Sequence, residues 1–243
     1  MNGLRIGLAG LVLTAGALTQ SAFGQSQVPP LAEMGFQSIF DGKSLSGWDG
    51  DPDFWRVEDG EIVGETKADH QPKQNTFLIW RGARPGDFEF KMQYKLTGAQ
   101  ANSGLQYRSV ELPDVAKWVL KGYQADIDVA QTYTGQLYEE RGRTFLALRG
   151  QISYIPEGGK PGSIGSTGDS NELKGFIHAN DWNDLHVIAR GNTLIHILNG
   201  HVMSVTIDDD KAGRKMDGVI GIQLHKTTAA MKMEVKTVRI KQF

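Results

Sequence analysis

The stretch Phe88-Glu89-Phe90-Lys91-Met92-Gln93-Tyr94-Lys95-Leu96 alternates without a break between apolar residues and charged or polar ones. Successive side chains of a β-strand point to opposite faces, so five large apolar side chains share one face and four polar ones share the other. The pattern predicts a strand whose apolar face lies on a hydrophobic core and whose other face meets solvent.

The same pattern recurs on both sides of this stretch. Shorter alternating runs are separated by turn dipeptides such as Asp59-Gly60 and Asn199-Gly200, which favour tight hairpins. Leu185 to Ile207 is typical of a three-stranded meander, and no apolar run of helical period is long enough to cover a parallel sheet. We therefore predict an all-β protein, a two-sheet antiparallel jelly-roll sandwich.

Three segments interrupt the strand pattern. Leu112 to Lys121 is predicted to be an insertion with one helical turn, because Pro113 stands near its start. Glu157 to Gly175 is rich in Gly, Ser and Asp and is predicted to be the longest loop, either a lid or a disordered segment. Asp208 to Asp210 is predicted to be a solvated acidic turn.

The first 24 residues have the features of a signal peptide. Arg5 precedes an apolar run from Ile6 to Leu18, which is too short to span a bilayer, and small residues follow at Ala22 and Gly24. We predict cleavage after Gly24 and a periplasmic or secreted protein. Residues 25–35 are then an extended lead-in, and residues 36–243 are expected to form a single domain.

Composition narrows the chemistry and the partners. The chain of 243 residues has no cysteine, which removes thiol catalysis and requires a large core to stabilise an exported protein without disulfides. Its 26 Lys and Arg nearly balance 28 Asp and Glu, so no nucleic acid is expected as a partner, and no membrane after signal cleavage. A neutral ligand such as a carbohydrate fits better. The histidine spacing supports no zinc site, so no metal or cofactor is predicted; a divalent cation and the oligomeric state stay open.

Three predicted strands carry short polar side chains on one face, where a solvated strand usually carries Lys, Thr, Glu or Ser. The central strand, Tyr123 to Val129, places Gln124, Asp126 and Asp128 on one side. The other two strands contribute Asn102, Gln106 and Arg108, and Gln223 and His225. Together these side chains supply the donors and acceptors that several sugar hydroxyls need, so we predict one shared groove. Taken singly, each strand has the alternative of an ordinary wet or structural face.

Several segments resemble the 3-keto-disaccharide hydrolase family. They are Phe40-Asp41-Gly42-Lys43-Ser44-Leu45-Ser46-Gly47-Trp48, Asn102-Ser103-Gly104-Leu105-Gln106-Tyr107-Arg108, Gly122-Tyr123-Gln124-Ala125-Asp126, Thr134-Gly135-Gln136-Leu137-Tyr138 and Ile222-Gln223-Leu224-His225. The resemblance implies a concanavalin-like jelly roll, mostly exported, that acts on 3-keto-sugars or accompanies glycosidases. Many members of the family carry Glu at the position of Gly122.

The residues favour elimination over ordinary glycoside hydrolysis. Jelly-roll glycosidases use Glu-x-Asp-x-Glu on a central strand, whereas this chain has Gln124-x-Asp126-x-Asp128, and a neutral Gln cannot be the carboxylate nucleophile of a retaining enzyme. In a 3-keto sugar the ketone acidifies the C2 proton, so its removal lets the C1 oxygen leave before water adds.

That route needs a base, an enolate stabiliser and a proton donor. We assign Asp126 or His225 as the base, and Glu139 or Tyr138 as the group that assists departure of the C1 oxygen. Arg108 with Gln124 and Gln223 would steady the enolate, while Asn102, Gln106 and Arg141 are predicted to bind substrate. The alternative is a non-catalytic carbohydrate-binding module of an exported glycan-degrading system, because the same groove would serve a lectin-like role.

Overall fold

Strand β6 (Phe88–Thr97) has the alternating burial that its sequence predicts. Its five apolar side chains, from Phe88 to Leu96, are each at most 4% exposed, which confirms them as core. Burying one such side chain contributes roughly 1.5–3 kcal/mol to folding, so the five together contribute on the order of 10 kcal/mol.

The structure is a computed structural model that describes Met1 and residues 33–243. The predicted signal peptide beyond Met1, with its cleavage site, and most of the predicted lead-in lie outside the described residues. Residues 35–243 form one compact unit. Within residues 33–243, no helix has the length and hydrophobicity that crossing a membrane requires.

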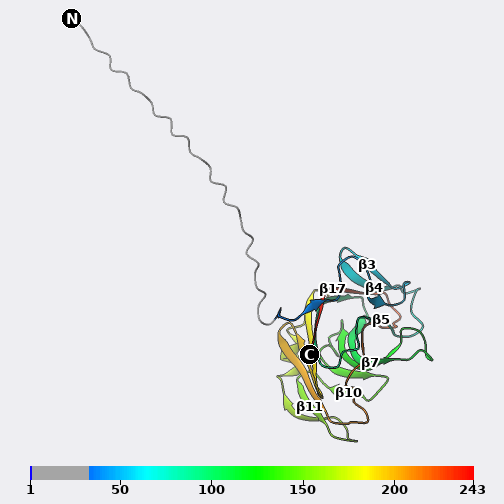
Figure 1. The fold of residues 1–243 in the computed structure, drawn as a ribbon, viewed down its shortest axis with the longest axis vertical. Helices are drawn as coiled ribbons and strands as arrows, with labels where there is room; N and C mark the ends of the chain where they lie inside the picture. The colour runs from blue at the N-terminus through cyan, green and yellow to red at the C-terminus, as the bar shows by residue number, and fades with distance from the viewer. Residues whose placement is uncertain (2–32) are drawn as a thin grey trace. The chain divides into compact units, whose positions relative to one another are not determined.

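The larger sheet has ten strands and contains β6 near its middle. Its strands β3, β4, β11 and β17 are labelled in Figure 1. Its order is β12-β11-β15-β14-β13-β6-β17-β4-β3, with β1 beside β17. The strands are β1 (Gln37–Ser38), β3 (Trp55–Glu58), β4 (Glu61–Thr66), β11 (Gln151–Ile155), β12 (Gly162–Ser166), β13 (Asn183–Arg190), β14 (Thr193–Leu198), β15 (His201–Asp208) and β17 (Met231–Gln242). The predicted meander is β13-β14-β15, and positive φ angles of 49° at Asn199 and 83° at Gly200 make its tight turn.

The smaller sheet has seven strands in the order β10-β9-β8-β7-β16-β5-β2. They are β2 (Trp48–Asp49), β5 (Thr76–Trp80), β7 (Asn102–Glu111), β8 (Leu120–Asp128), β9 (Leu137–Glu140), β10 (Thr144–Ala147) and β16 (Val219–Leu224). The main core cluster takes side chains from both sheets. The predicted all-β, two-sheet sandwich is therefore confirmed.

The outer face of the smaller sheet has a second apolar cluster. Phe77, Ile79, Leu120 and Val219 are buried there under Trp118, which belongs to the connection between β7 and β8. This connection is the predicted insertion, and its helical turn is present: the Ala116 amide donates to the Leu112 carbonyl at 3.2 Å. The insertion thus covers the apolar part of the outer face.

Two predictions about loops are wrong. The segment from Glu157 to Gly175 contains strand β12 and the short helix α1 (Ser170–Lys174), because Asp169 caps the helix by accepting from two of its amides. The acidic turn is not solvated at its first residue. Asp208 is only 1% exposed because Tyr123 and Arg143 both donate to its carboxylate.

Candidate functional site

The polar faces of β7 and β8 coincide as predicted. Across the antiparallel pair, Asn102 lies opposite Asp128, Gly104 opposite Asp126 and Gln106 opposite Gln124. Directly paired residues of neighbouring strands point to the same face, so these side chains form one polar surface on the outer side of the smaller sheet.

This surface is the floor of a groove of about 330 Å³, within the size range of small-ligand sites. It is lined by Asn75, Asn102, Gln124, Asp126, Tyr133, Tyr138, Glu140, Phe145 and His225. Five of these are predicted site residues: Asn102, Gln124, Asp126, Tyr138 and His225. The structure therefore brings both candidate bases, Asp126 and His225, to the same groove.

A chain of hydrogen bonds runs beneath the groove toward Asp126. Gln223 Nε2 donates to Gln124 Oε1 at 3.0 Å, and Gln124 Nε2 donates to Asp126 Oδ1 at 2.6 Å. The Gln124 side chain has room because Gly104 lies under it, and a Cβ at Gly104 would stand 2.6 Å from Gln124 Cγ. The two amides fix the orientation of the Asp126 carboxyl group.

Burial, with a smaller contribution from the negative charges of Asp128 and Glu140, raises the pKa of Asp126 to about 7 against the opposing effect of the hydrogen bond from Gln124. The side chain is only 7% exposed. A carboxyl group with a pKa near neutrality accepts a proton far more readily than an ordinary aspartate, which suits a general base.

His225 lines the groove, and a hydrogen bond to the backbone fixes the tautomer of its ring. Its Nδ1 lies 2.8 Å from the Lys226 carbonyl oxygen, and a carbonyl oxygen only accepts, so Nδ1 carries the hydrogen. In the neutral ring Nε2 is then the acceptor. His225 therefore has the tautomer that a base requires, and after protonation it becomes a donor.

Aromatic rings form one wall of the groove. Tyr133 and Phe145 stack with ring centroids 5.7 Å apart, and Tyr138 meets Phe145 edge to face at 5.1 Å. Tyr133 and Phe145 remain 40% and 38% exposed. Asp128 holds this wall in place, because its carboxylate accepts from the amides of Thr132, Tyr133 and Thr134. The hydrogen bonds of the Asp128 carboxylate are thus made to the loop that carries Tyr133.

Arg108 does not lie in the groove, so its predicted role at the enolate is wrong. A β-bulge follows Tyr107 in the pairing of β7 with β8, and Arg108 has a φ of 45°, which turns its side chain away from the face of Gln106. The guanidinium is 1% exposed and donates to the carbonyls of Gly86 and Gly191 and to Asp87.

Glu139 also lies elsewhere, so its predicted catalytic role is wrong. It pairs with Tyr123 across β8 and β9, and both side chains point to the face opposite Asp126. Its carboxylate accepts from Arg143 Nε at 2.6 Å, and Arg143 in turn binds Asp208 at 2.6 Å. Its neighbour Glu140 takes the place in the groove, where Asn75 Nδ2 donates to it at 3.3 Å.

The other predicted binding residues lie beneath or beside the groove. Gln106 and Gln223 are fully buried; Gln106 donates to the Gly122 carbonyl at 3.3 Å, and Gln223 acts through Gln124. Arg141 lies at the rim, where it donates to Gln74 at 3.1 Å and approaches Glu140 at 4.0 Å. At Gly122 a Cβ would stand 2.3 Å from Ser109 Oγ, so the glutamate common in the resembling family does not fit there.

Asn75, Tyr133, Glu140 and Phe145 are the groove residues that sequence reasoning missed. Asn75, Tyr133 and Phe145 lie outside the three strands whose alternation indicated the site, and Glu140 ends a short strand. Among residues 33–243 there is no cluster of three or more His, Asp or Glu that would hold a metal ion.

Comparison with known families identifies the chain. The model of the 3-keto-alpha-glucoside-1,2-lyase-like domain matches residues 35–241. The chain belongs to this 3-keto-glucoside lyase-like family. The suspected relationship to 3-keto-disaccharide hydrolases is thus confirmed, and the match covers every strand that lines the groove. No curated protein matches the chain.

Solved structures share the fold of this lyase-like domain. A candidate glycosyl hydrolase from Parabacteroides distasonis is 19% identical with a TM-score of 0.57, over 89% of this chain and 98% of that one. Carbohydrate-binding module CBM66 from Bacillus subtilis is 15% identical with a TM-score of 0.52, over 81% and 96%. A Bacillus subtilis protein with a galectin-like fold is 11% identical with a TM-score of 0.53, over 82% and 90%. These likenesses confirm the jelly-roll architecture.

Proposed function

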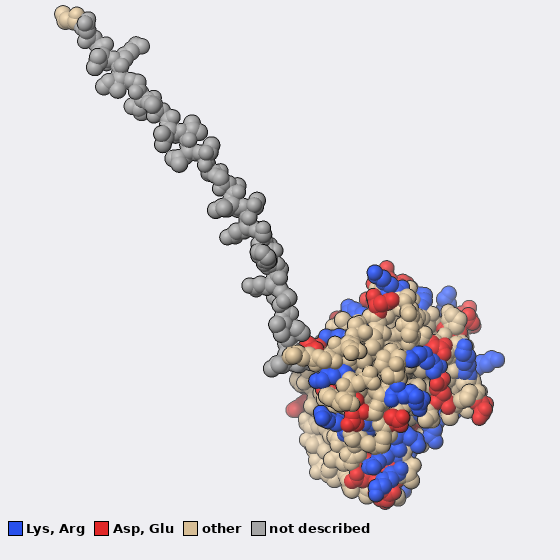
Figure 2. All heavy atoms as spheres, in the orientation of Figure 1, with Lys and Arg blue, Asp and Glu red and all other residues tan. Residues whose placement is uncertain are grey.

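We propose that this protein is an exported enzyme that cleaves 3-keto-glycosides by elimination and hydration. The observation that carries the proposal is Asp126, a buried carboxyl group with a pKa raised to about 7 on the floor of a polar groove. Membership of the 3-keto-alpha-glucoside-1,2-lyase-like family supports this chemistry. The near-balance of charge and the interspersed acidic and basic side chains on the visible face favour a neutral substrate (Figure 2).

In the first step Asp126 removes the C2 proton of the keto sugar. The electron pair of the C–H bond forms an enolate with the C3 ketone, and the second proton of the Gln124 amide and the Asn102 amide are the donors available to its oxygen. The enolate then collapses: the C3 ketone reforms, a C1–C2 double bond forms, and the bond from C1 to the leaving oxygen breaks.

The leaving oxygen needs a proton, and Tyr138 supplies it. Burial, then Glu140 and Asp126, raise the pKa of Tyr138 above its ordinary value, so the phenol is protonated at neutral pH. Water subsequently adds to C1 and gives its remaining proton to the Tyr138 phenolate, while the Asp126 carboxyl group, whose proton has exchanged with solvent, returns a proton to C2. His225, with its free Nε2, is the second candidate for the base or for activating this water.

The alternative is a carbohydrate-binding module without catalysis. The observation that favours it is the aromatic wall of Tyr133, Tyr138 and Phe145, in which Tyr133 and Phe145 are exposed, because such rings stack on sugars in binding sites as well as in enzymes. The fold it shares with CBM66 is compatible with this role.

A substrate panel separates the two functions. The purified protein is incubated with 3-keto disaccharides and with the same disaccharides unoxidised, and free 3-keto-glucose is measured. We expect release from the keto substrates alone. Binding of disaccharides without release of any product would favour the binding module.

Export has its own test. We expect periplasmic or secreted material to have a mature N-terminus near Gln25, because the signal features end at Gly24. Mass spectrometry of the intact protein measures this terminus directly. Full-length protein retained in the membrane fraction would contradict both the cleavage and the localisation.

A further inference from the structure

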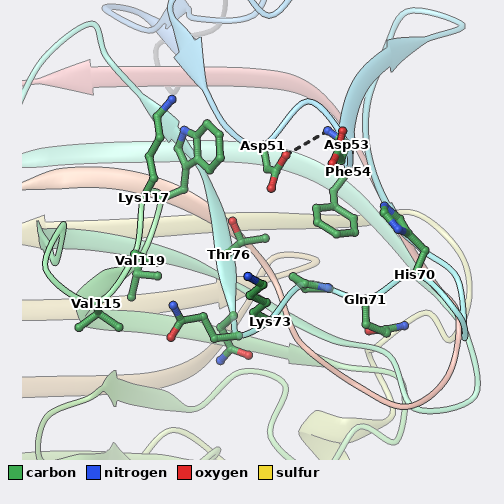
Figure 3. A pocket seen from close by; sticks show the side chains of 15 residues that line it. Asp51, Asp53, Phe54, His70, Gln71, Lys73, Thr76, Val115, Lys117 and Val119 are labelled. Carbon is green, nitrogen blue, oxygen red and sulfur yellow. Dashed lines mark hydrogen bonds between the residues drawn. The ribbon is translucent and has the colours of Figure 1, made fainter.

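A second and larger cleft, of about 530 Å³, shares Asn75 with the groove. Figure 3 shows the side chains that line this cleft. Three connections form it, with Thr76 at the start of β5: the turn between β2 and β3 around Asp51, the β4–β5 connection from His70 to Asn75, and the insertion from Val115 to Val119. The proposed elimination uses none of these side chains. The cleft therefore has a volume suitable for a ligand and no role so far.

The cleft and the groove share a wall. Asn75 lines both, and its side chain is fixed on both ends: Nδ2 donates to Glu140 in the groove at 3.3 Å, and Oδ1 accepts from the Lys226 amide at 3.0 Å. Beside it, Gln74 lines the cleft and accepts from Arg141 at the rim of the groove at 3.1 Å. A molecule that crosses Asn75 would reach both sites at once.

The chemistry of the cleft favours a neutral, hydroxyl-rich ligand. Asp51 and Asp53 are balanced by Lys73 and Lys117, so the lining presents both donors and acceptors without a net charge of one sign. The aromatic faces are already covered, because His70 stacks on Phe54 at 4.9 Å and the Lys117 ammonium lies 4.0 Å from the centroid of Trp118. An apolar ligand would find little uncovered ring surface.

Trp118 gives the cleft a rigid back wall. Its indole nitrogen donates to Asp49 at 2.6 Å, its carbonyl accepts from the Phe77 amide at 3.0 Å, and its ring packs on the second apolar cluster. Its φ of 58° is rare for a bulky residue, and such backbone persists only where the surroundings hold it. Because this wall is already rigid, it loses little conformational entropy when a ligand binds.

We propose that the cleft is the binding site for the leaving sugar of the substrate, with the keto sugar in the groove and the glycosidic bond near Asn75. The inference rests on the proposed function and deepens it: the preferred substrates are 3-keto-glycosides whose leaving group is itself a sugar, over those with a small alkyl leaving group. Asn75 is the positioning residue between the two sites.

The test is a binding comparison with two probes, a 3-keto disaccharide of glucose and methyl 3-keto-glucoside. Both are titrated by calorimetry into Asp126→Asn protein, so that turnover does not consume them. Val115→Trp then fills the cleft from a side chain that is 48% exposed. We expect the dissociation constant of the disaccharide to rise at least about tenfold and that of the methyl glycoside to change less than about twofold.

Val202→Trp is the matched control, because Val202 is 36% exposed on β15 of the other sheet. It should leave both dissociation constants unchanged. If Val115→Trp fails to fold, Ala116→Trp blocks the same cleft. The proposal would be overturned if Asp126→Asn protein bound the two probes with equal affinity or did not bind the disaccharide. It would also be overturned if Val115→Trp weakened the binding of both probes equally. Turnover by the parent protein is a separate result: its absence refutes the enzyme but leaves this comparison decisive for the cleft.

Discussion

Asp126→Asn is expected to lower kcat on a 3-keto disaccharide by at least about 100-fold, because positioned general bases typically contribute about 10²- to 10⁴-fold. The amide keeps the size of the side chain and still accepts the hydrogen bond from Gln124. Steady-state kinetics measure the loss. Asp184→Asn, on an exposed position of β13, is the control and should change nothing. Unchanged turnover in Asp126→Asn would exclude Asp126 as the base and move that role to His225.

The same substitution has a pH signature. In the parent protein kcat/KM should rise with pH and level off above about 7, where Asp126 is ionised. The free energy of unfolding should instead fall as pH rises. The folded pKa of about 7 lies above the unfolded value of 3.8, so the folded state loses stability as pH rises between them. This ionisation costs up to about 4 kcal/mol at pH 8. Asp126→Asn should therefore melt higher than the parent at pH 8, with the advantage vanishing near pH 4.

Arg143→Met is expected to destabilise the fold by about 3–5 kcal/mol, the usual cost of leaving buried charges without their partner. Arg143 binds the carboxylates of Glu139 and Asp208, whose side chains are 5% and 1% exposed. Urea unfolding at pH 7 measures the loss. The deficit should shrink in acid, because the abandoned carboxylates can then bind protons.

Arg141→Met is the matched control for Arg143→Met. The Arg141 side chain is 35% exposed and 4.0 Å from its carboxylate partner, so removing it should cost less than about 1 kcal/mol. Equal stability losses in the two variants would contradict the structural role assigned to Glu139 and reopen its catalytic one.

The alternation of residues predicted the groove residues correctly on the strands that have no bulge. Gln124 and Asp126 on β8 and Asn102 on β7 lie on one face because their alternation runs unbroken through the paired register. Arg108 obeys the same alternation in the sequence, but the bulge after Tyr107 turns it to the other side. A bulge adds a residue without a distinctive sequence, so the error could not be seen in advance.

Glu139 shows a second limit. Tyr138 and Glu139 are adjacent on β9 and therefore point to opposite faces, so only one of them could share the groove with Asp126. Pairing of Gln124 with Tyr138 selects Tyr138, and with it Glu140. Asn75 and Phe145 are more than 45 residues from each other and from β16, and only the sheet order brings them together. The local periodicity of the sequence does not predict long-range pairing of this kind.

The elimination itself has one direct test, the fate of the C2 hydrogen in D2O. A 3-keto disaccharide is incubated with the protein in D2O, and the early 3-keto-glucose product is examined by mass spectrometry and NMR, with 3-keto-glucose plus protein as the control for later exchange. If Asp126 removes the C2 proton and hydration returns one from solvent, the product carries deuterium at C2 above the control. Product that retains hydrogen at C2 would contradict elimination with exchange of the Asp126 proton and would favour direct hydrolysis at C1.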